Sequence, residues 1–242
     1  MTDEINTRMT QFKGLRVTDV CDGLDAIGLI DTCTMDWEIR PLWRDTDTFR
    51  HRIVGIAHTV RFVPTKRVVP RPMSLEDYQD WKSRWYRELA PGPKESIQPG
   101  EIIVIDAAEV GDVGFIGSNN AQGWINAGAH GVVTNGGCRD TDELIKQGIP
   151  VYSRRIARGI RPGRLEWDAE NVPVACGGVR VFPGDIVVAD GDGVIVVPRG
   201  HAAQVAEIAR GIANHDKASR LDKYREAGIE PDETVEPLQP DR

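Results

Sequence analysis

The chain has few cysteines, no excess of basic residues and no long apolar run, and each shortage excludes a class of protein. Its four cysteines are widely spaced and form no Cys-x-x-Cys motif, which argues against a disulfide framework or a cysteine-rich zinc site. No stretch approaches the roughly 18 apolar residues of a membrane-spanning helix. The acidic N-terminus, Met1–Glu4, lacks the apolar segment of a signal peptide. We therefore expect a reduced, cytoplasmic protein that makes no membrane contact.

The charge balance is acidic. The 30 Lys and Arg residues are outnumbered by 37 Asp and Glu residues, which gives a formal net charge of −7. The basic residues do not gather into a stripe, so we expect no nucleic-acid partner. A length of 242 residues, with 40% apolar residues, 25 glycines and 15 prolines, suits a compact α/β protein that contains many turns.

The spacing of apolar residues predicts both strands and helices. Strands are expected at residues 53–63, 102–106, 131–134, 151–152, 179–182, 186–189 and 194–197, and helices at 15–30, 121–129 and 201–213. A further helix is expected after the cap-like start Ser74–Asp77. Together these elements predict a mixed α/β domain that is rich in strands in its second half, rather than a regular βαβ series.

The helix after Ser74 carries an aromatic stripe, formed by Tyr78, Trp81 and Trp85 at three- and four-residue spacing. Such a stripe usually packs against its own domain or against a neighbouring subunit. The alternative is a lid that covers a substrate.

Two short motifs enclose one predicted helix and strand. Gly117-Ser118-Asn119-Asn120 precedes the helix, and Gly136-Gly137-Cys138-Arg139-Asp140 follows the strand, with the glycine pair expected to form a turn. A helix N-terminus offers free N–H groups to a carboxylate. Arg139 adds a planar cation, and Asp140 adds a hard oxygen ligand for a divalent metal. This combination could hold a small oxo acid by its carboxylate and its carbonyl.

Each motif also has an interpretation without a ligand. Arg139 and Asp140 could form an exposed turn with a local ion pair, and Ser118-Asn119-Asn120 could serve merely as a helix cap. Cys138 has no histidine nearby in the sequence, so we expect a buried apolar side chain and not a nucleophile. His130, between the helix and the strand, is expected to be a surface residue.

The two motifs resemble the signature of the RraA-like family, in which a Gly-x-Asn-x-Ala sequence is followed by Arg-Asp. Here Ser118 and Arg139 stand 21 positions apart. The similarity extends to residues 17–24, 55–60, 183–190 and 193–198. The family includes class II, metal-dependent aldolases of 4-hydroxy-4-methyl-2-oxoglutarate and 4-carboxy-4-hydroxy-2-oxoadipate, and regulators of ribonuclease E activity.

The resemblance implies the fold and the assembly. It implies a β/β/α swivelling-type sandwich, with mixed sheets and flanking helices, over residues 1–215. A helical insertion is expected around residues 65–96, and a charged C-terminal tail at residues 216–242. The resemblance also implies a homotrimer or homohexamer whose active sites lie between subunits.

The function implied by the resemblance is a divalent-metal-dependent carbon–carbon lyase that acts on a small 2-oxo acid through a pyruvate enolate. Asp140 would bind Mg²⁺ or Mn²⁺. The substrate would contact Gly117, Ser118, Asn119, Asn120 and Arg139, and the catalytic roles would fall to Arg139 and Ser118.

One residue departs from the family pattern, because the aldolases usually have aspartate where this chain has Ser118. A serine hydroxyl cannot by itself act as a base near neutral pH, so the departure favours decarboxylation or altered lyase chemistry over aldol cleavage. The alternative function is a non-catalytic, protein-binding regulator of a ribonuclease.

Overall fold

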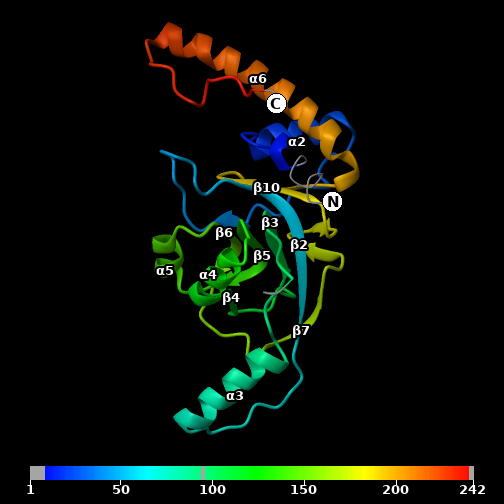
Figure 1. The fold of residues 1–242 in the computed structure, drawn as a ribbon, viewed down its shortest axis with the longest axis vertical. Coiled ribbons are helices and arrows are strands. Elements are labelled where there is room, and N and C mark those ends of the chain that lie inside the picture. Colours follow the sequence, from blue (N-terminus) through cyan, green and yellow to red (C-terminus); the bar gives the residue numbers. More distant parts are fainter. Residues whose placement is uncertain (1–8, 94–95, 240–242) are drawn as a thin grey trace.

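A curled, mixed sheet of nine strands forms the centre of the computed structural model, which describes residues 9–93 and 96–239 (Figure 1). The strand order is β1-β6-β5-β3-β2-β10-β11, with β4 paired to β5 and β7 paired to β2. The bounds are β1 Arg40–Pro41, β2 Ile53–Pro64, β3 Glu101–Asp106, β4 Gly114–Ile116, β5 Gly131–Cys138, β6 Val151–Ile156, β7 Leu165–Glu170, β10 Ile186–Asp190 and β11 Gly193–Val197. The end strands β1 and β11 also contact each other, so the sheet is nearly closed.

The two faces of the central strands are covered by different layers. In β3, four successive buried residues run from Ile102 to Ile105, as expected for a strand without a solvent face. Ile103 and Ile105 belong to the core cluster that contains Trp124 of α4 (Ser118–Asn126) and Leu144 of α5 (Thr141–Gln147). Ile102 and Val104 belong to a second core cluster, which includes residues of the small hairpin formed by β8 (Val174–Cys176) and β9 (Val179–Val181).

The centre of the sheet contains a βαβ series that the sequence pattern did not indicate. Strands β2, β3, β5 and β6 are parallel neighbours, and α4 and α5 are part of the connections that lead into and out of β5. The turn predicted at Gly136-Gly137 is wrong, because β5 continues through both residues to Cys138. A Cβ atom on Gly136 would lie 2.7 Å from the Cβ of Ala107, and one on Gly137 would lie 2.6 Å from the Cβ of Ala157. Glycine at these two positions therefore allows neighbouring residues to pack directly against the backbone of β5.

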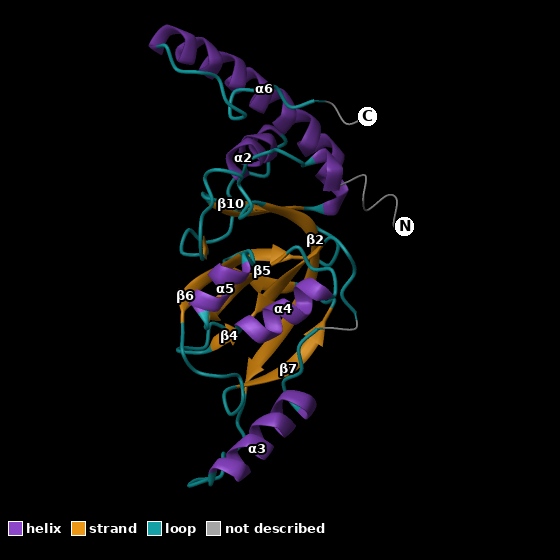
Figure 2. Ribbon diagram, turned by 60° about the vertical axis from the view of Figure 1, so that its left-hand side comes forward, coloured by secondary structure: helices purple, strands orange, loops and turns teal. Residues whose placement is uncertain are grey.

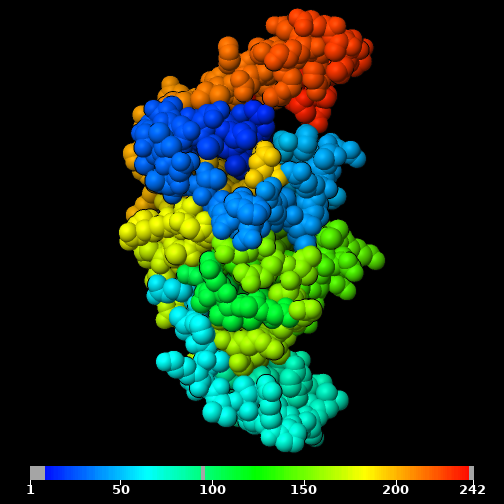
Figure 3. Space-filling model, turned by 180° about the vertical axis from the view of Figure 1, so that it is seen from behind, coloured from blue at the N-terminus to red at the C-terminus, as the bar shows by residue number. Residues whose placement is uncertain are grey.

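Two helices lie at one end of the molecule and a third lies at the other. Helix α2 (Val17–Ala26) packs against α6 (Ala202–Ala227), while α3 (Leu75–Glu88) stands at the opposite end (Figures 1 and 3). Helix α6, preceded by the short 3₁₀ helix Arg199–His201, is longer than the helix expected at residues 201–213 and runs without a break through residue 215.

The chain after α6 returns along that helix (Figure 2). The ammonium group of Lys217 donates to the carbonyl oxygens of Glu233 and Thr234 at 3.1 Å each, and the side chain of Val235 is buried. Residues beyond 215 are thus partly packed and hydrogen-bonded. Among the described residues, no helix is long and apolar enough to cross a membrane.

Helix α3 is attached to the body through its aromatic stripe. Ser74 caps its N-terminus as expected, with the hydroxyl accepting from the Asp77 N–H at 3.1 Å. Trp85 is 4% exposed, and its indole N–H donates to the carbonyl of Leu165 at 3.0 Å. The ring of Trp81 lies 5.6 Å from that of Trp85. The packing interpretation of the stripe is confirmed for Trp85.

Candidate functional site

A pocket of about 490 Å³ lies between α3, the N-terminus of α4 and the end of β5. It is lined by Lys82, Ser83, Tyr86, Gly92, Gly117, Asn119, Asn120, Arg139, Asp140, Ile160 and Arg161. The structure therefore brings the predicted site residues together, apart from Ser118, which contacts Asp140 instead of lining the pocket. A neighbouring cavity of about 580 Å³, on another side of α3, has no carboxylate among its lining residues.

Asp140 occupies the junction between β5 and α5. Its backbone has the left-handed conformation (φ 55°) that Asp and Asn adopt more readily than most residues. Its carboxylate accepts from the backbone N–H of Ser118 at 3.2 Å and from the Nε of Arg139 at 3.2 Å. The Ser118 hydroxyl lies 3.5 Å away, at the outer limit of a hydrogen bond. These contacts hold a partly exposed carboxylate at the pocket.

Two glycines allow the Arg139-Asp140 pair to lie close to β4 and α4. A Cβ atom on Gly117 would stand 2.8 Å from the Oδ2 of Asp140. One on Gly114 would stand 2.6 Å from the Cβ of Arg139. Both distances are shorter than van der Waals contact, so any side chain at these positions displaces the pair.

The pocket is cationic although the protein is acidic. Lys82, Arg139 and Arg161 line it, and Asp140 is the single carboxylate among its lining residues. The first turn of α4 adds the N–H groups of Asn119 and Asn120, which have no partner within a helix. Cations and helix N–H groups around one carboxylate suit a small anionic ligand that carries hard oxygen atoms.

The donor set around Asp140 fits a hard divalent cation. Among the described residues, no group of three His, Cys, Asp or Glu side chains could enclose a metal ion. A metal at Asp140 would therefore keep several waters and take further oxygen ligands from a substrate, which is how Mg²⁺ commonly binds in proteins. The long contacts of the carboxylate, at 3.2 Å and beyond, leave its oxygens able to accept such a ligand.

Several other residues with polar or reactive side chains lie outside this site. His130 is exposed, as expected, and its Nδ1 lies 3.2 Å from the carbonyl of Val54, away from the pocket. Asp185 and Asp190 accept backbone N–H groups at turns. Cys138 is fully buried with its sulfur 3.3 Å from the hydroxyl of Ser153, and burial raises the pKa of the thiol.

We expect Cys138 to resist alkylation in the folded protein. Its thiol is inaccessible and its raised pKa keeps it protonated at neutral pH, whereas the thiolate is the reactive form. Iodoacetamide at pH 8, followed by peptide mass spectrometry, should modify the half-buried Cys21 first and Cys138 only after unfolding. Rapid native labelling of Cys138 would contradict its assignment as a packing residue.

The sequence analysis did not predict the wall of the pocket that α3 and Arg161 form. Lys82 and Tyr86 are four positions apart, one position beyond Trp81 and Trp85 on the same helix, so helical spacing could have placed them on a shared face. Arg161 stands among several arginines, and nothing in the sequence distinguishes it from them.

Comparison with known proteins places the chain and its fold in one group of α/β proteins. Residues 17–196 match the RraA-like family, described as Aldolase/RraA, and the chain belongs to this family. A protein of Halalkalibacterium halodurans named "Putative 4-hydroxy-4-methyl-2-oxoglutarate aldolase" is 28% identical over 214 residues, which cover 87% of this chain and 85% of that protein. A Thermus thermophilus protein named 4-hydroxy-4-methyl-2-oxoglutarate aldolase is 31% identical over 101 residues, 41% of this chain and 60% of that protein.

The same fold occurs in the crystal structure of Streptomyces coelicolor RraAS2, described as an unusual member of the RNase ES inhibitor RraA protein family. The TM-score is 0.70 at 25% sequence identity, with 89% of this chain and 96% of that chain covered. The predicted family is confirmed, and so is the predicted fold class, a mixed α/β sandwich with flanking helices.

Proposed function

We propose that this protein is a divalent-metal-dependent carbon–carbon lyase that acts on a 2-oxo acid and releases pyruvate. The observation that carries the proposal is Asp140, a partly exposed carboxylate held by Ser118 and Arg139 inside an otherwise cationic pocket. The relatives named as 4-hydroxy-4-methyl-2-oxoglutarate aldolases support the lyase class.

In this proposal the chain binds the reacting end of the substrate by charge. Arg139 and the first-turn N–H groups of α4 hold the 1-carboxylate and the 2-oxo oxygen. Mg²⁺ or Mn²⁺ held by Asp140 and water would supply Lewis-acid polarisation of the 2-oxo group. When the C3–C4 bond breaks, its electron pair remains on the pyruvate fragment as an enolate, and transfer of a proton from water to C3 then gives pyruvate. Arg139 donates to an oxygen that becomes more negative as the bond breaks, which stabilises the transition state more than the ground state.

Two reactions share this enolate but differ in their need for a base. Aldol cleavage requires removal of the proton of the 4-hydroxyl group, whereas decarboxylation of a 2-oxo-dicarboxylate such as oxaloacetate releases CO₂ directly. Among the described residues, the Ser118 hydroxyl contacts only the carboxylate of Asp140, at 3.5 Å, and in this proposal that carboxylate binds the metal and is not free to act as a base. We propose decarboxylation, or aldol cleavage with a carboxylate base that a neighbouring subunit of a trimer or hexamer contributes.

The test is pyruvate release from a panel of acids, coupled to lactate dehydrogenase. The panel contains 4-hydroxy-4-methyl-2-oxoglutarate, 4-carboxy-4-hydroxy-2-oxoadipate and oxaloacetate, each with Mg²⁺, with Mn²⁺ and after EDTA treatment. We expect turnover that EDTA abolishes and added metal restores. Turnover of oxaloacetate alone would identify a decarboxylase, and turnover of the hydroxy acids would show that aldol cleavage proceeds with Ser118.

A second candidate function is a protein-binding regulator of a ribonuclease. The structural likeness to RraAS2 extends over most of both chains and supports this candidate. Calorimetry with Mg²⁺ and pyruvate separates the two, because a regulator has no need for a metal site that a 2-oxo acid strengthens. Absence of both turnover and substrate-enhanced metal binding would reject the lyase and favour the regulator.

A further inference from the structure

Arg161 is a buried cation that has no counter-ion in the part of the chain that the structure describes. Its side chain is 2% exposed, and among the described residues no carboxylate forms an ion pair with it. Nη1 donates to the carbonyl of Pro91 at 3.2 Å, while Nε has no hydrogen-bond partner. The guanidinium carbon lies 4.8 Å from the ring centre of Phe115 and 4.9 Å from that of Tyr86.

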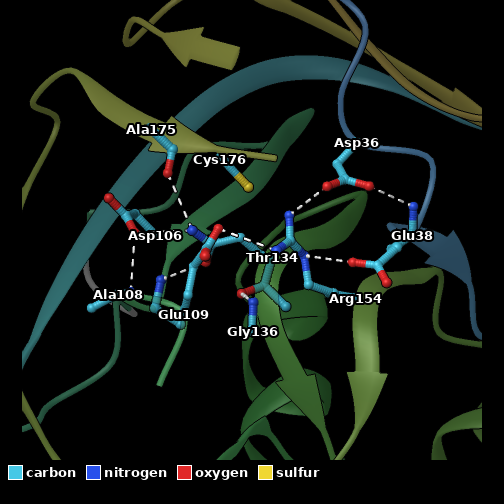
Figure 4. A network of polar contacts seen from close by, with 12 residues as sticks. Asp36, Glu38, Asp106, Ala108, Glu109, Thr134, Gly136, Arg154, Ala175 and Cys176 are labelled. Atoms are coloured by element: carbon cyan, nitrogen blue, oxygen red, sulfur yellow. Dashed lines mark hydrogen bonds and ion pairs between the residues drawn. The ribbon is translucent and has the colours of Figure 1, made fainter. Parts of the chain in front are cut away.

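A second, largely buried arginine shows the usual arrangement. Arg154 lies within 4 Å of three carboxylates, those of Asp36, Glu38 and Glu109, at 2.9, 3.7 and 3.2 Å (Figure 4). A buried charge destabilises a protein unless it is paired, and the described residues supply such pairing to Arg154 but not to Arg161. Aromatic rings compensate Arg161 only in part.

Arg161 remains charged at neutral pH. Burial lowers the pKa of its guanidinium to about 10, and nearby Tyr86 opposes this shift. The side chain therefore presents an unpaired positive charge to whatever occupies the adjoining space. That space is the pocket of Arg139 and Asp140, which Arg161 and Tyr86 line together with Lys82.

The pocket thus has two walls of different character. The wall formed by α4 and the end of β5 holds Asp140 and Arg139, the groups assigned to the reacting end of the substrate. The wall formed by α3 and Arg161 holds Lys82 and Tyr86 and has no acidic residue among those that line the pocket.

We propose that the wall formed by α3 and Arg161 is a second anion subsite, which binds a carboxylate of the substrate remote from the 2-oxo group. The proposal rests on the lyase function and assigns residues to the second carboxylate that all three acids of the panel carry. Arg161 supplies the unpaired, desolvated donor, and Lys82 adds a more exposed positive charge.

The first test compares two substrates that differ in the remote group. We expect Arg161→Met to lower kcat/KM for 4-hydroxy-4-methyl-2-oxoglutarate about 100-fold, mainly through KM, because a desolvated charge contact is lost. Lys82→Met should lower it about threefold to tenfold. For 4-hydroxy-2-oxopentanoate, whose remote end carries no charge, we expect both variants to have the same kcat/KM as the unchanged protein. Arg84→Met is the control, because it removes an exposed cation of α3 that does not line this pocket. It should leave kcat/KM for both substrates unchanged.

The second test does not need turnover, so it separates this proposal from failure of the lyase function. Calorimetry in Mg²⁺ should show 2-oxoglutarate binding at least about tenfold more tightly than pyruvate. Arg161→Met should remove that difference and leave the affinity for pyruvate unchanged. If circular dichroism shows that Arg161→Met is not folded, the affinities of Lys82→Met for the two acids are compared instead. Equal affinity for both acids in the unchanged protein, or an unaltered preference in a folded variant, would overturn the subsite.

Discussion

Replacing Asp140 with asparagine is expected to lower kcat/KM for pyruvate release about a thousandfold or more while leaving the fold intact. Asparagine has the same shape and, like aspartate, tolerates the left-handed backbone found at this position (φ 55°). The change removes the negative charge that the proposed divalent cation requires. It also removes the charge that pairs with Arg139 at 3.2 Å. Activity should therefore fall without a matching loss of stability.

The matched control is Asp142→Asn, an equal change of charge at an exposed position in the first turn of α5. Both variants should be compared for kcat/KM, for Mg²⁺ affinity by calorimetry, and for the midpoint of thermal unfolding. Asp142→Asn should keep full activity. If Asp140→Asn also keeps most of its activity and metal affinity, Asp140 is not the metal ligand and the proposed mechanism fails.

Gly117→Ala is expected to reduce kcat/KM about a hundredfold, although the residue added is a single methyl group. The backbone of Gly117 (φ −117°) is open to alanine, so the cost is steric. The new Cβ would lie 2.8 Å from the Oδ2 of Asp140, and the carboxylate must move to relieve the contact. Displacement of a catalytic group by about 1 Å costs roughly that factor in rate.

Gly123→Ala is the control on the same helix, because a Cβ at Gly123 meets nothing within 4 Å. Alanine in a helix interior is more favourable than glycine by about 1 kcal/mol, so this variant should be slightly more stable and fully active. Urea unfolding monitored by tryptophan fluorescence, together with kcat/KM, measures both effects. Full activity of Gly117→Ala would show that Asp140 has more freedom to move than its contacts indicate.

Much of the site was predictable because it is local in sequence. Residues 117–120 and the Arg139-Asp140 pair are joined by α4 and β5, and a helix followed by an adjacent strand brings its two ends to predictable places. Seven strands were predictable from their apolar and β-branched residues, whereas β1, β4, β7 and β8 were not predicted. The glycine pair was misread, because Gly136 and Gly137 indicate a turn by propensity. Their close approach to Ala107 and Ala157, which requires glycine in a strand, is a tertiary contact.

The missed wall of the pocket depends on contacts between distant parts of the chain. Helical spacing predicted α3 but not where it docks, since docking involves the burial of Trp85 in the core and its hydrogen bond to Leu165, 80 positions away. Arg161 becomes distinctive only when its burial is known, together with its lack of a carboxylate partner over residues 9–93 and 96–239. Likewise, the sequence after residue 215 resembles a charged tail. Its packing becomes evident only from the hydrogen bond of Lys217 to Glu233 and the burial of Val235.

The attachment of α3 also bears on how such a protein can diversify. The helix is anchored on one side by Trp85, while Lys82 and Tyr86 reach the pocket from another. Exchange of one helical turn there would retune which acids are accepted without disturbing the glycines or the carboxylate at the end of β5. One reaction centre could in this way serve different substrates, because each new preference would require changes in only a few side chains at the edge of the pocket and none in the rest of the fold.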